Sequence, residues 1–201
     1  MLPSTSPKSL VVLISGHGSN LQAILDACMA GDLPARVAAV FSDQHEAYGL
    51  ERSRQAGVPA IVFPKTKDQD RRSYDALLAN EVAAFQPDWV VLAGWMRILS
   101  SNFLDRFPGR VVNLHPALPG TFPGTHAIER AYEAFGRGEI TQTGVMVHLV
   151  PDEGVDSGPV LASQVVVIES GETLESLEER IHAVEHRLLV STLRSLCEEG
   201  A

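Results

Sequence analysis

The feature that most constrains the fold is a repeated alternation between short apolar runs and segments with helical spacing of apolar residues. Runs rich in Val, Ile, Leu and Ala occupy residues 10–15, 36–41, 59–63, 89–93 and 111–114. Helical patterns occupy residues 20–30, 47–55 and 71–85. Continuous apolar strands separated by helices are typical of a parallel sheet covered on both faces. Right-handed crossovers then predict a doubly wound, Rossmann-like α/β fold with a mostly parallel sheet.

The second half of the chain has a different pattern. A helix is predicted over residues 125–135, followed by two longer strands, 144–150 and 160–167, with a loop between them. A long helix is predicted over residues 174–197. No repeat or low-complexity linker interrupts the pattern, so we expect one domain over residues 10–201. The polar start, residues 1–9, is expected to be a flexible leader.

Composition narrows the classes of partner. The chain has 201 residues, 45% of them hydrophobic, which suffices for a sizeable core. Its 16 Lys and Arg against 25 Asp and Glu give a net charge of -9. We therefore expect small-molecule substrates rather than nucleic acid or an anionic membrane surface. Two cysteines without metal-ligand spacing, and no apolar stretch of membrane-spanning length, predict a cytoplasmic protein. The sequence leaves a monomer and a homodimer equally open.

The stretch SGHGSNL, residues 15–21, joins the first strand to the first helix. Ligands of open α/β sheets bind beyond the carboxyl ends of the strands, and a helix N-terminus favours a phosphate there. Gly16 and Gly18 allow close approach to the backbone, while Ser19, as N-cap, and Asn20 offer side-chain hydrogen bonds. An ordinary glycine turn with a serine cap explains the stretch equally well. Because it matches neither GxGxxG nor a P-loop, a dinucleotide or nucleoside triphosphate is not predicted.

The stretch VVNLHP, residues 111–116, places two polar side chains at the end of a strand. Asn113 and His115 are two residues apart, so they point to the same face, and Val112 and Leu114 point to the other. An amide can donate to a developing oxyanion, and an imidazole can exchange a proton near neutral pH. A polar strand end with a satisfied histidine is the alternative.

Two further stretches are candidates for ligand contact. In HLVPDEGVDSGP, residues 148–159, the carboxylates Asp152, Glu153 and Asp156 suit a general base, a metal ligand or a solvated turn. No His or Cys cluster accompanies them, so no metal is predicted. In AGWMRIL, residues 93–99, apolar residues around Arg97 suit either a pocket for a flat, partly apolar ligand or simple core packing.

Taken together, these stretches resemble the phosphoribosylglycinamide formyltransferase family of purine synthesis, which uses 10-formyltetrahydrofolate as formyl donor. SGHGSNL is similar to the family's phosphate loop, AGWMRILS to its folate segment and NLHP to its catalytic pair. VDSGP resembles its catalytic aspartate loop, and IHAVEH, residues 181–186, its C-terminal motif. The motifs occur in the family's order over almost the whole chain, which makes the set far more specific than any one of them.

The resemblance implies a role for each candidate residue. Asn113 is expected to hydrogen-bond the formyl oxygen. His115 is expected to handle the proton and stabilise the oxyanion. Asp156 is expected to orient His115, keep it charged and help relay the proton through water.

The resemblance also implies two binding regions, with phosphate binding in residues 10–100 and catalysis and folate binding in residues 101–201. The ribonucleotide is expected to contact Gly18, Ser19, Asn20, Arg71 and Glu185. The folate, as co-substrate and without a metal, is expected to contact Met96, Arg97, Ile98, Leu99, Asp152 and Glu153. His182 and His186 are interpreted as packing or capping residues of the last helix.

Three departures from the family pattern concern the loops around the site. His17 stands where asparagine is common, which is expected to alter phosphate affinity or its pH dependence. ALPGTFPG, residues 117–124, replaces an SLLP-type continuation, and the segment before Asp156 is one residue longer around Pro151. Two enzymes on the same scaffold are alternatives, although methionyl-tRNA formyltransferase is expected to carry an RNA-binding domain and formyltetrahydrofolate hydrolase a regulatory one. A binding module without catalysis is the third.

Overall fold

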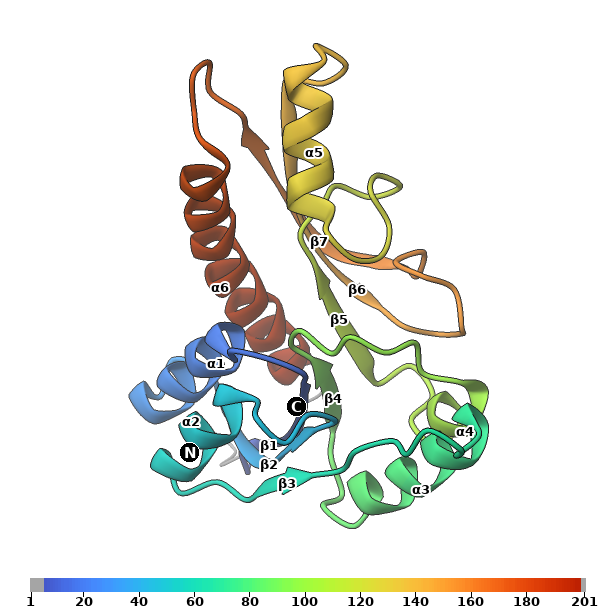
Figure 1. Cartoon of the computed structure of the whole chain (residues 1–201). Coiled ribbons are helices and arrows are strands. Elements are labelled where there is room, and N and C mark those ends of the chain that lie inside the picture. Colours follow the sequence, from blue (N-terminus) through green and yellow to red (C-terminus); the bar gives the residue numbers. More distant parts are fainter. Residues whose placement is uncertain (1–5, 200–201) are drawn as a thin grey trace.

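A computed structural model describes residues 6–199 as one seven-stranded sheet flanked by helices (Figure 1). The strands are β1 (Lys8–Ile14), β2 (Ala35–Ser42), β3 (Ala60–Val62), β4 (Trp89–Leu92), β5 (Val111–His115), β6 (Gln142–Leu149) and β7 (Val160–Val167). The helices are α1 (Ser19–Ala30), α2 (Tyr48–Gln55), α3 (Arg71–Ala83), α4 (Ser101–Leu104), α5 (Ala127–Gly136) and α6 (Leu174–Glu199).

Strand pairing changes from parallel to antiparallel across the sheet. Its strand order is β3-β2-β1-β4-β5-β6-β7, and every pair from β3 to β5 is parallel. β6 pairs antiparallel with both β5 and β7. Chain order reverses at β1, where the sheet first grows toward β3 and then continues from β4 on the other side. The mostly parallel, doubly wound sheet predicted from the alternating pattern is confirmed.

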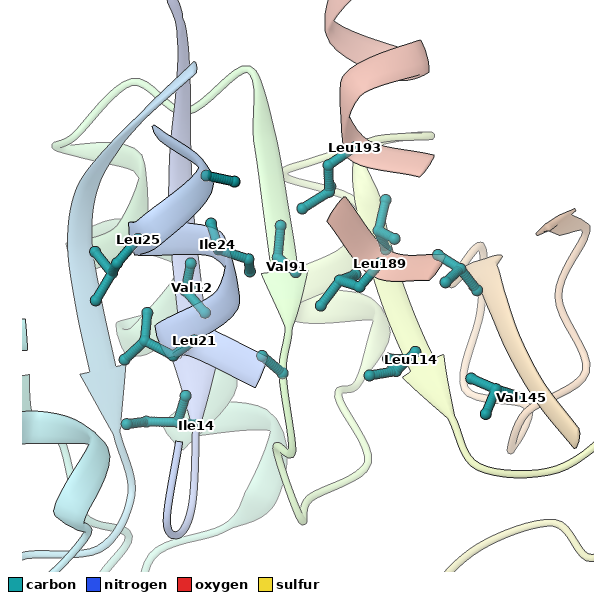
Figure 2. Close-up of a cluster of buried hydrophobic side chains, with 14 of the residues drawn as sticks. Val12, Ile14, Leu21, Ile24, Leu25, Val91, Leu114, Val145, Leu189 and Leu193 are labelled. Carbon is teal, nitrogen blue, oxygen red and sulfur yellow. The ribbon is translucent and has the colours of Figure 1, made fainter. Parts of the chain in front are cut away.

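The central strand β1 is buried on both faces, as its continuous apolar sequence predicts. Leu10, Val12 and Ile14 contribute to one hydrophobic core, and Val11 and Leu13 contribute to the other. The first core is completed by α1, α2, α5 and α6, and Figure 2 shows how residues of α1 and α6 cover the strands there. The second core is completed by α3 and α4. The two layers hold the carboxyl ends of β1, β4 and β5 at one common edge.

The predicted elements differ from the observed ones mainly at their ends. The helix α4 was not predicted, because four residues are too few to show a periodic pattern. The predicted leader was also too long, since Lys8 and Ser9 belong to β1 and the Ser9 amide donates to Asp88 at 2.7 Å. Residues 1–5 lie outside the described part of the chain. Within residues 6–199, no helix has both the length and the hydropathy to cross a membrane.

Of the two glycines of SGHGSNL, Gly18 lets α2 approach the loop closely. Gly18 has φ +75, and a Cβ on it would lie 2.6 Å from the Cα of Gly49. The Gly49 amide donates to the Gly16 carbonyl at 3.1 Å, which joins the start of α2 to the loop. The close backbone approach predicted for this loop is therefore made, at Gly18, by the chain's own helix.

Because of this contact, we expect Gly18→Ala to lower the free energy of unfolding by more than a Gly→Ala change at an open position. Overpacking against backbone should cost about 1–3 kcal/mol, in addition to about 1–2 kcal/mol for a left-handed alanine. Gly31→Ala is a matched control, because Gly31 has φ +78 and, among the described residues, no atom within 4 Å of the place that a Cβ would take. Urea unfolding should show the larger loss of stability for Gly18→Ala. Equal losses would mean that the contact with Gly49 does not constrain the loop.

Candidate active site

The predicted catalytic residues meet at the carboxyl end of β5. Asn113 and His115 lie on β5, where they pair across the antiparallel register with His148 and Met146 of β6. Val112 and Leu114 point the other way into the first core, as the two-residue period predicts. Asp156 comes from the loop between β6 and β7. The antiparallel return of β6 therefore brings Asp156 back beside β5.

The carboxylate of Asp156 joins the parts of the site. Its Oδ1 accepts a hydrogen bond from Asn113 Nδ2 at 3.1 Å, and its Oδ2 accepts one from the Gly124 amide at 2.8 Å. The same Oδ2 lies 3.3 Å from Nδ1 of His115. Asp156 has φ +49, a left-handed conformation that non-glycine residues rarely adopt and that is frequent at functional sites.

Burial opposes a positive charge on His115, whose side chain is only 5% exposed. Burial lowers the pKa of His115, and the neighbouring Asp156 and the carbonyl of Phe122 offset only part of that effect. Burial therefore opposes the charge that Asp156 favours on His115, and the expectation that Asp156 keeps His115 charged stays a prediction. Burial alone would raise the pKa of Asp156, but the contact with His148 and the Gly124 amide lower it overall, so this carboxyl stays ionised.

Sequence reasoning missed the contribution of His148. This buried side chain lies with Nε2 3.1 Å from Asn113 Nδ2 and 3.5 Å from Asp156 Oδ1. Its Nδ1 donates to the Leu149 carbonyl at 2.8 Å, which holds the ring in place. His148 begins the quoted stretch HLVPDEGVDSGP, but only the register between β5 and β6 shows that it faces Asn113.

The 117–124 segment, which departs from the family's sequence pattern, folds over His115. Nε2 of His115 lies 3.1 Å from the Phe122 carbonyl, and Phe122 itself has φ +46. Arg130 of α5 donates to the carbonyls of Phe122 and Pro123, each at 2.7 Å. Arg130 thus holds this loop against the imidazole, a role that no local sequence pattern indicated.

A cavity of about 370 Å³ opens beside Asp156. It lies between the 117–124 segment and the loop before β7, with Met146 of β6 also contributing to its lining. Its volume is within the range of small-molecule sites. A larger cavity of about 440 Å³ lies over α1, α2 and β2, and none of the predicted catalytic residues lines it.

The α1 end of the predicted ribonucleotide site is also assembled. Gly18, not Ser19 as predicted, is the N-cap of α1, and no side chain within residues 6–199 caps this helix. Ser19 is instead the first helical residue. Asn20 donates to Glu185 of α6 at 3.3 Å, and the same carboxylate oxygen lies 2.7 Å from Nδ1 of His182. The amide oxygen of Asn20 is buried without a hydrogen-bond partner in the described part of the chain, so the site has an open acceptor.

Arg71 was predicted to contact the ribonucleotide, but in the structure it contacts a residue that was predicted to bind the folate. Its guanidinium donates to Glu153, one of the predicted folate residues, and that carboxylate also accepts from the Ser101 amide at 3.1 Å. The Ser101 amide is the largest cause that lowers the pKa of Glu153. Arg71 and Glu153 thus tie the loop before Asp156 to the starts of α3 and α4.

The predicted folate segment divides into exposed and packed residues. Met96 and Ile98 are exposed beside the carboxyl end of β4, whereas Leu99 is buried in the second core. Arg97 lies over the Tyr74 ring and 3.8 Å from buried Asp43. Asp152 is exposed and accepts from the Gly154 amide at 2.8 Å, which is a turn contact. In this segment, a ligand can therefore reach the side chains of Met96 and Ile98.

No group of three or more His, Cys, Asp or Glu side chains within residues 6–199 is arranged to hold a metal ion. The chemistry available at the site is hydrogen bonding by an amide and proton exchange by a buried imidazole beside an ionised carboxylate. That combination suits an acyl-type transfer through a tetrahedral intermediate.

Comparisons with known proteins agree with this geometry. A protein-family model described as formyl transferase matches residues 8–193. The phosphoribosylglycinamide formyltransferase of Schizosaccharomyces pombe is 48% identical, with 96% of this chain and 98% of that protein aligned. The Escherichia coli K12 protein of the same name is 42% identical, with 90% and 82% aligned.

A solved structure of a similar protein supports the same family assignment. Glycinamide ribonucleotide transformylase 1 from Symbiobacterium toebii superposes with a TM-score of 0.92 at 41% identity, over 99% of this chain and 92% of that one. Fold, motif order and identity over nearly the full length agree, and the chain belongs to the phosphoribosylglycinamide formyltransferase family.

Proposed function

We propose that this formyltransferase moves the formyl group of 10-formyltetrahydrofolate to the amine of 5'-phosphoribosylglycinamide, giving the N-formyl product and tetrahydrofolate. The observation that carries the proposal is the contact of Asn113 and His115 with one ionised carboxylate, Asp156, beside a cavity. We propose small molecules as the only partners of a cytoplasmic monomer or homodimer. Two free cysteines, Cys28 and Cys197, support a reducing compartment.

The first step is attack of the free amine on the formyl carbon. A C–N bond forms, the C=O bond becomes a single bond, and the formyl oxygen acquires negative charge. The amide of Asn113 stabilises this oxyanion by turning towards it one of the two N–H groups that face Asp156 and His148 in the ligand-free structure. These two contacts keep the amide beside the position of the formyl group, where a donor to the oxyanion lowers the barrier.

The proton is handled by His115. Both of its ring nitrogens face oxygen acceptors, Asp156 at Nδ1 and the Phe122 carbonyl at Nε2, so an imidazolium would have a partner for each N–H. Burial disfavours that cation until negative charge develops beside it. His115 therefore takes up the proton that the attacking amine loses as the oxyanion forms, with water beside Asp156 as the relay. It returns this proton to the folate nitrogen as the bond between the formyl carbon and that nitrogen breaks.

The second step breaks the bond between the formyl carbon and the folate nitrogen. The leaving nitrogen gains a proton, the attacking amine has lost one, and the formyl C=O is restored. No covalent enzyme intermediate is required. Both substrates must be bound together, with the ribonucleotide at α1 and Glu185 and the folate beside Met96 and Ile98. Arg71 contacts Glu153, which we propose to lie on the folate side of the site.

The experiment that tests this function follows the absorbance of 10-formyl-5,8-dideazafolate with glycinamide ribonucleotide. Turnover should require the ribonucleotide and should be lost in His115→Ala. His126→Ala is the matched control, because His126 is exposed and its imidazole pairs with Glu129 on the surface of α5. Deformylation without ribonucleotide would indicate a hydrolase instead, and binding without loss of the formyl group would indicate a binding module.

A second prediction concerns Asn113 as an oxyanion donor. Asn113→Ala should lower kcat about 100- to 1,000-fold, the usual effect of removing one such donor. Asn80→Ala, an exposed change on α3, should leave kcat unaltered. Steady-state kinetics at saturating concentrations of both substrates measures the effect. A rise in KM with unchanged kcat would show that Asn113 binds the ground state and the transition state equally, and would contradict its role as an oxyanion donor.

A further inference from the structure

We propose that the outer edge of β7 pairs with β7 of a second copy of this chain, so that the two sheets join into one continuous sheet. The two strands run antiparallel, and a two-fold axis passes beside Gln164. This inference assigns a surface to the homodimer and concerns the assembly of the protein. It does not depend on the formyl-transfer reaction.

The strand β7 is an open edge of the sheet. It is the last strand in the sheet order and, among residues 6–199, it pairs only with β6. Alternate residues of an antiparallel strand bond to a given neighbour, and the bond from the Ile168 amide to the Thr141 carbonyl sets this alternation. The backbone amides and carbonyls of Ser163, Val165 and Val167 therefore point away from β6, towards the outer edge.

The sequence of β7 lacks the features that keep an edge strand from pairing. VLASQVVV, residues 160–167, contains no charged residue and no proline. Val165 and Val167 alternate with Val166, which is buried in the first core beneath α6, so they lie on the opposite face. Their exposed fractions are 49% and 56%. The edge therefore offers open backbone groups next to exposed apolar side chains, a combination that favours strand addition.

A second copy of β7 fits this edge because the edge is complementary to itself. The Val167 carbonyl already accepts a hydrogen bond from Arg180 at 2.9 Å, which leaves Ser163 and Val165 as the regular positions open to a new strand. Pairing each of them with the other residue of the second copy places Gln164 beside its own copy. Each chain has a net charge of -9, but β7 is uncharged, so the two strands meet without like charges opposite each other.

The other edge of the sheet favours a closed dimer over a filament. That edge is β3, which spans only Ala60–Val62 and is half-buried. Short edge strands pair poorly, so addition of β7 to β3 of another copy, which would be open-ended, is disfavoured. Pairing of β7 with β7 uses the same surface on both copies and closes after two. One strand pair is a small interface, so we expect a reversible dimer in the micromolar range.

Sedimentation equilibrium of the full chain over a range of concentrations tests the assembly. The unchanged protein should show a monomer–dimer equilibrium, and Val165→Lys should raise its Kd about tenfold or more, because a charge on the edge opposes pairing. Met29→Lys is the matched control, since Met29 is an apolar side chain on α1 that is 85% exposed, and it should leave Kd unaltered. A monomer at every concentration, or a dimer equally stable in Val165→Lys, would overturn the inference.

A second variant, Gln164→Cys, keeps the edge uncharged and tests the pairing directly. Residues opposite each other in a non-hydrogen-bonded antiparallel pair have Cα atoms about 4.5 Å apart, a separation that a disulfide can span. Oxidation with copper phenanthroline should link Gln164→Cys into a covalent dimer. Ser191→Cys, an exposed position on α6, and the unchanged protein, with Cys28 and Cys197, should stay unlinked.

The cross-linking result does not depend on turnover, so this inference and the proposed function can fail separately. Absence of a covalent dimer in Gln164→Cys would overturn the pairing of β7 with β7. Equal cross-linking of Ser191→Cys would overturn it too, because the contact would then not be specific to this edge.

Discussion

The site depends on the contacts that the carboxylate of Asp156 makes. It connects β5 through Asn113 and His115, the 117–124 segment through the Gly124 amide, and β6 through His148. These groups come from three separate segments of the chain, so no local interaction could align them. The left-handed backbone of Asp156 is maintained by these contacts, which offset its conformational cost.

The sheet supplies the framework for this connection. Its parallel half carries the SGHGSNL loop at the carboxyl edge, where α1 begins, and its antiparallel extension returns Asp156 to the end of β5. The two parts meet at β5, which pairs parallel with β4 and antiparallel with β6, and α6 packs along α1 and the extension (Figure 1). One rigid sheet thereby places the proposed phosphate and formyl-transfer regions at neighbouring positions.

The fold was predictable because it depends on local patterns, whereas the catalytic roles of Asn113, His115 and Asp156 came from the resemblance to the formyltransferase family. Alternating apolar runs predicted the sheet, and the two-residue period predicted that Asn113 and His115 share a face. His148 was missed because its role depends on antiparallel register, and Arg130 was missed because it acts on backbone carbonyls of another segment. The sequence showed the attraction of Asp156 for a charged His115 but not the depth of burial, which opposes that charge.

The most direct test of the account is an NMR titration of the His115 imidazole in the ligand-free protein and in Asp156→Asn. If Asp156 offsets part of the effect of burial, the pKa of His115 should lie below 6.5 in the unchanged protein and fall further in the variant. The pKa of His182, raised by its hydrogen bond to Glu185, should stay above 6.5 in both. An unchanged or higher pKa of His115 in Asp156→Asn would contradict the central role of this carboxylate.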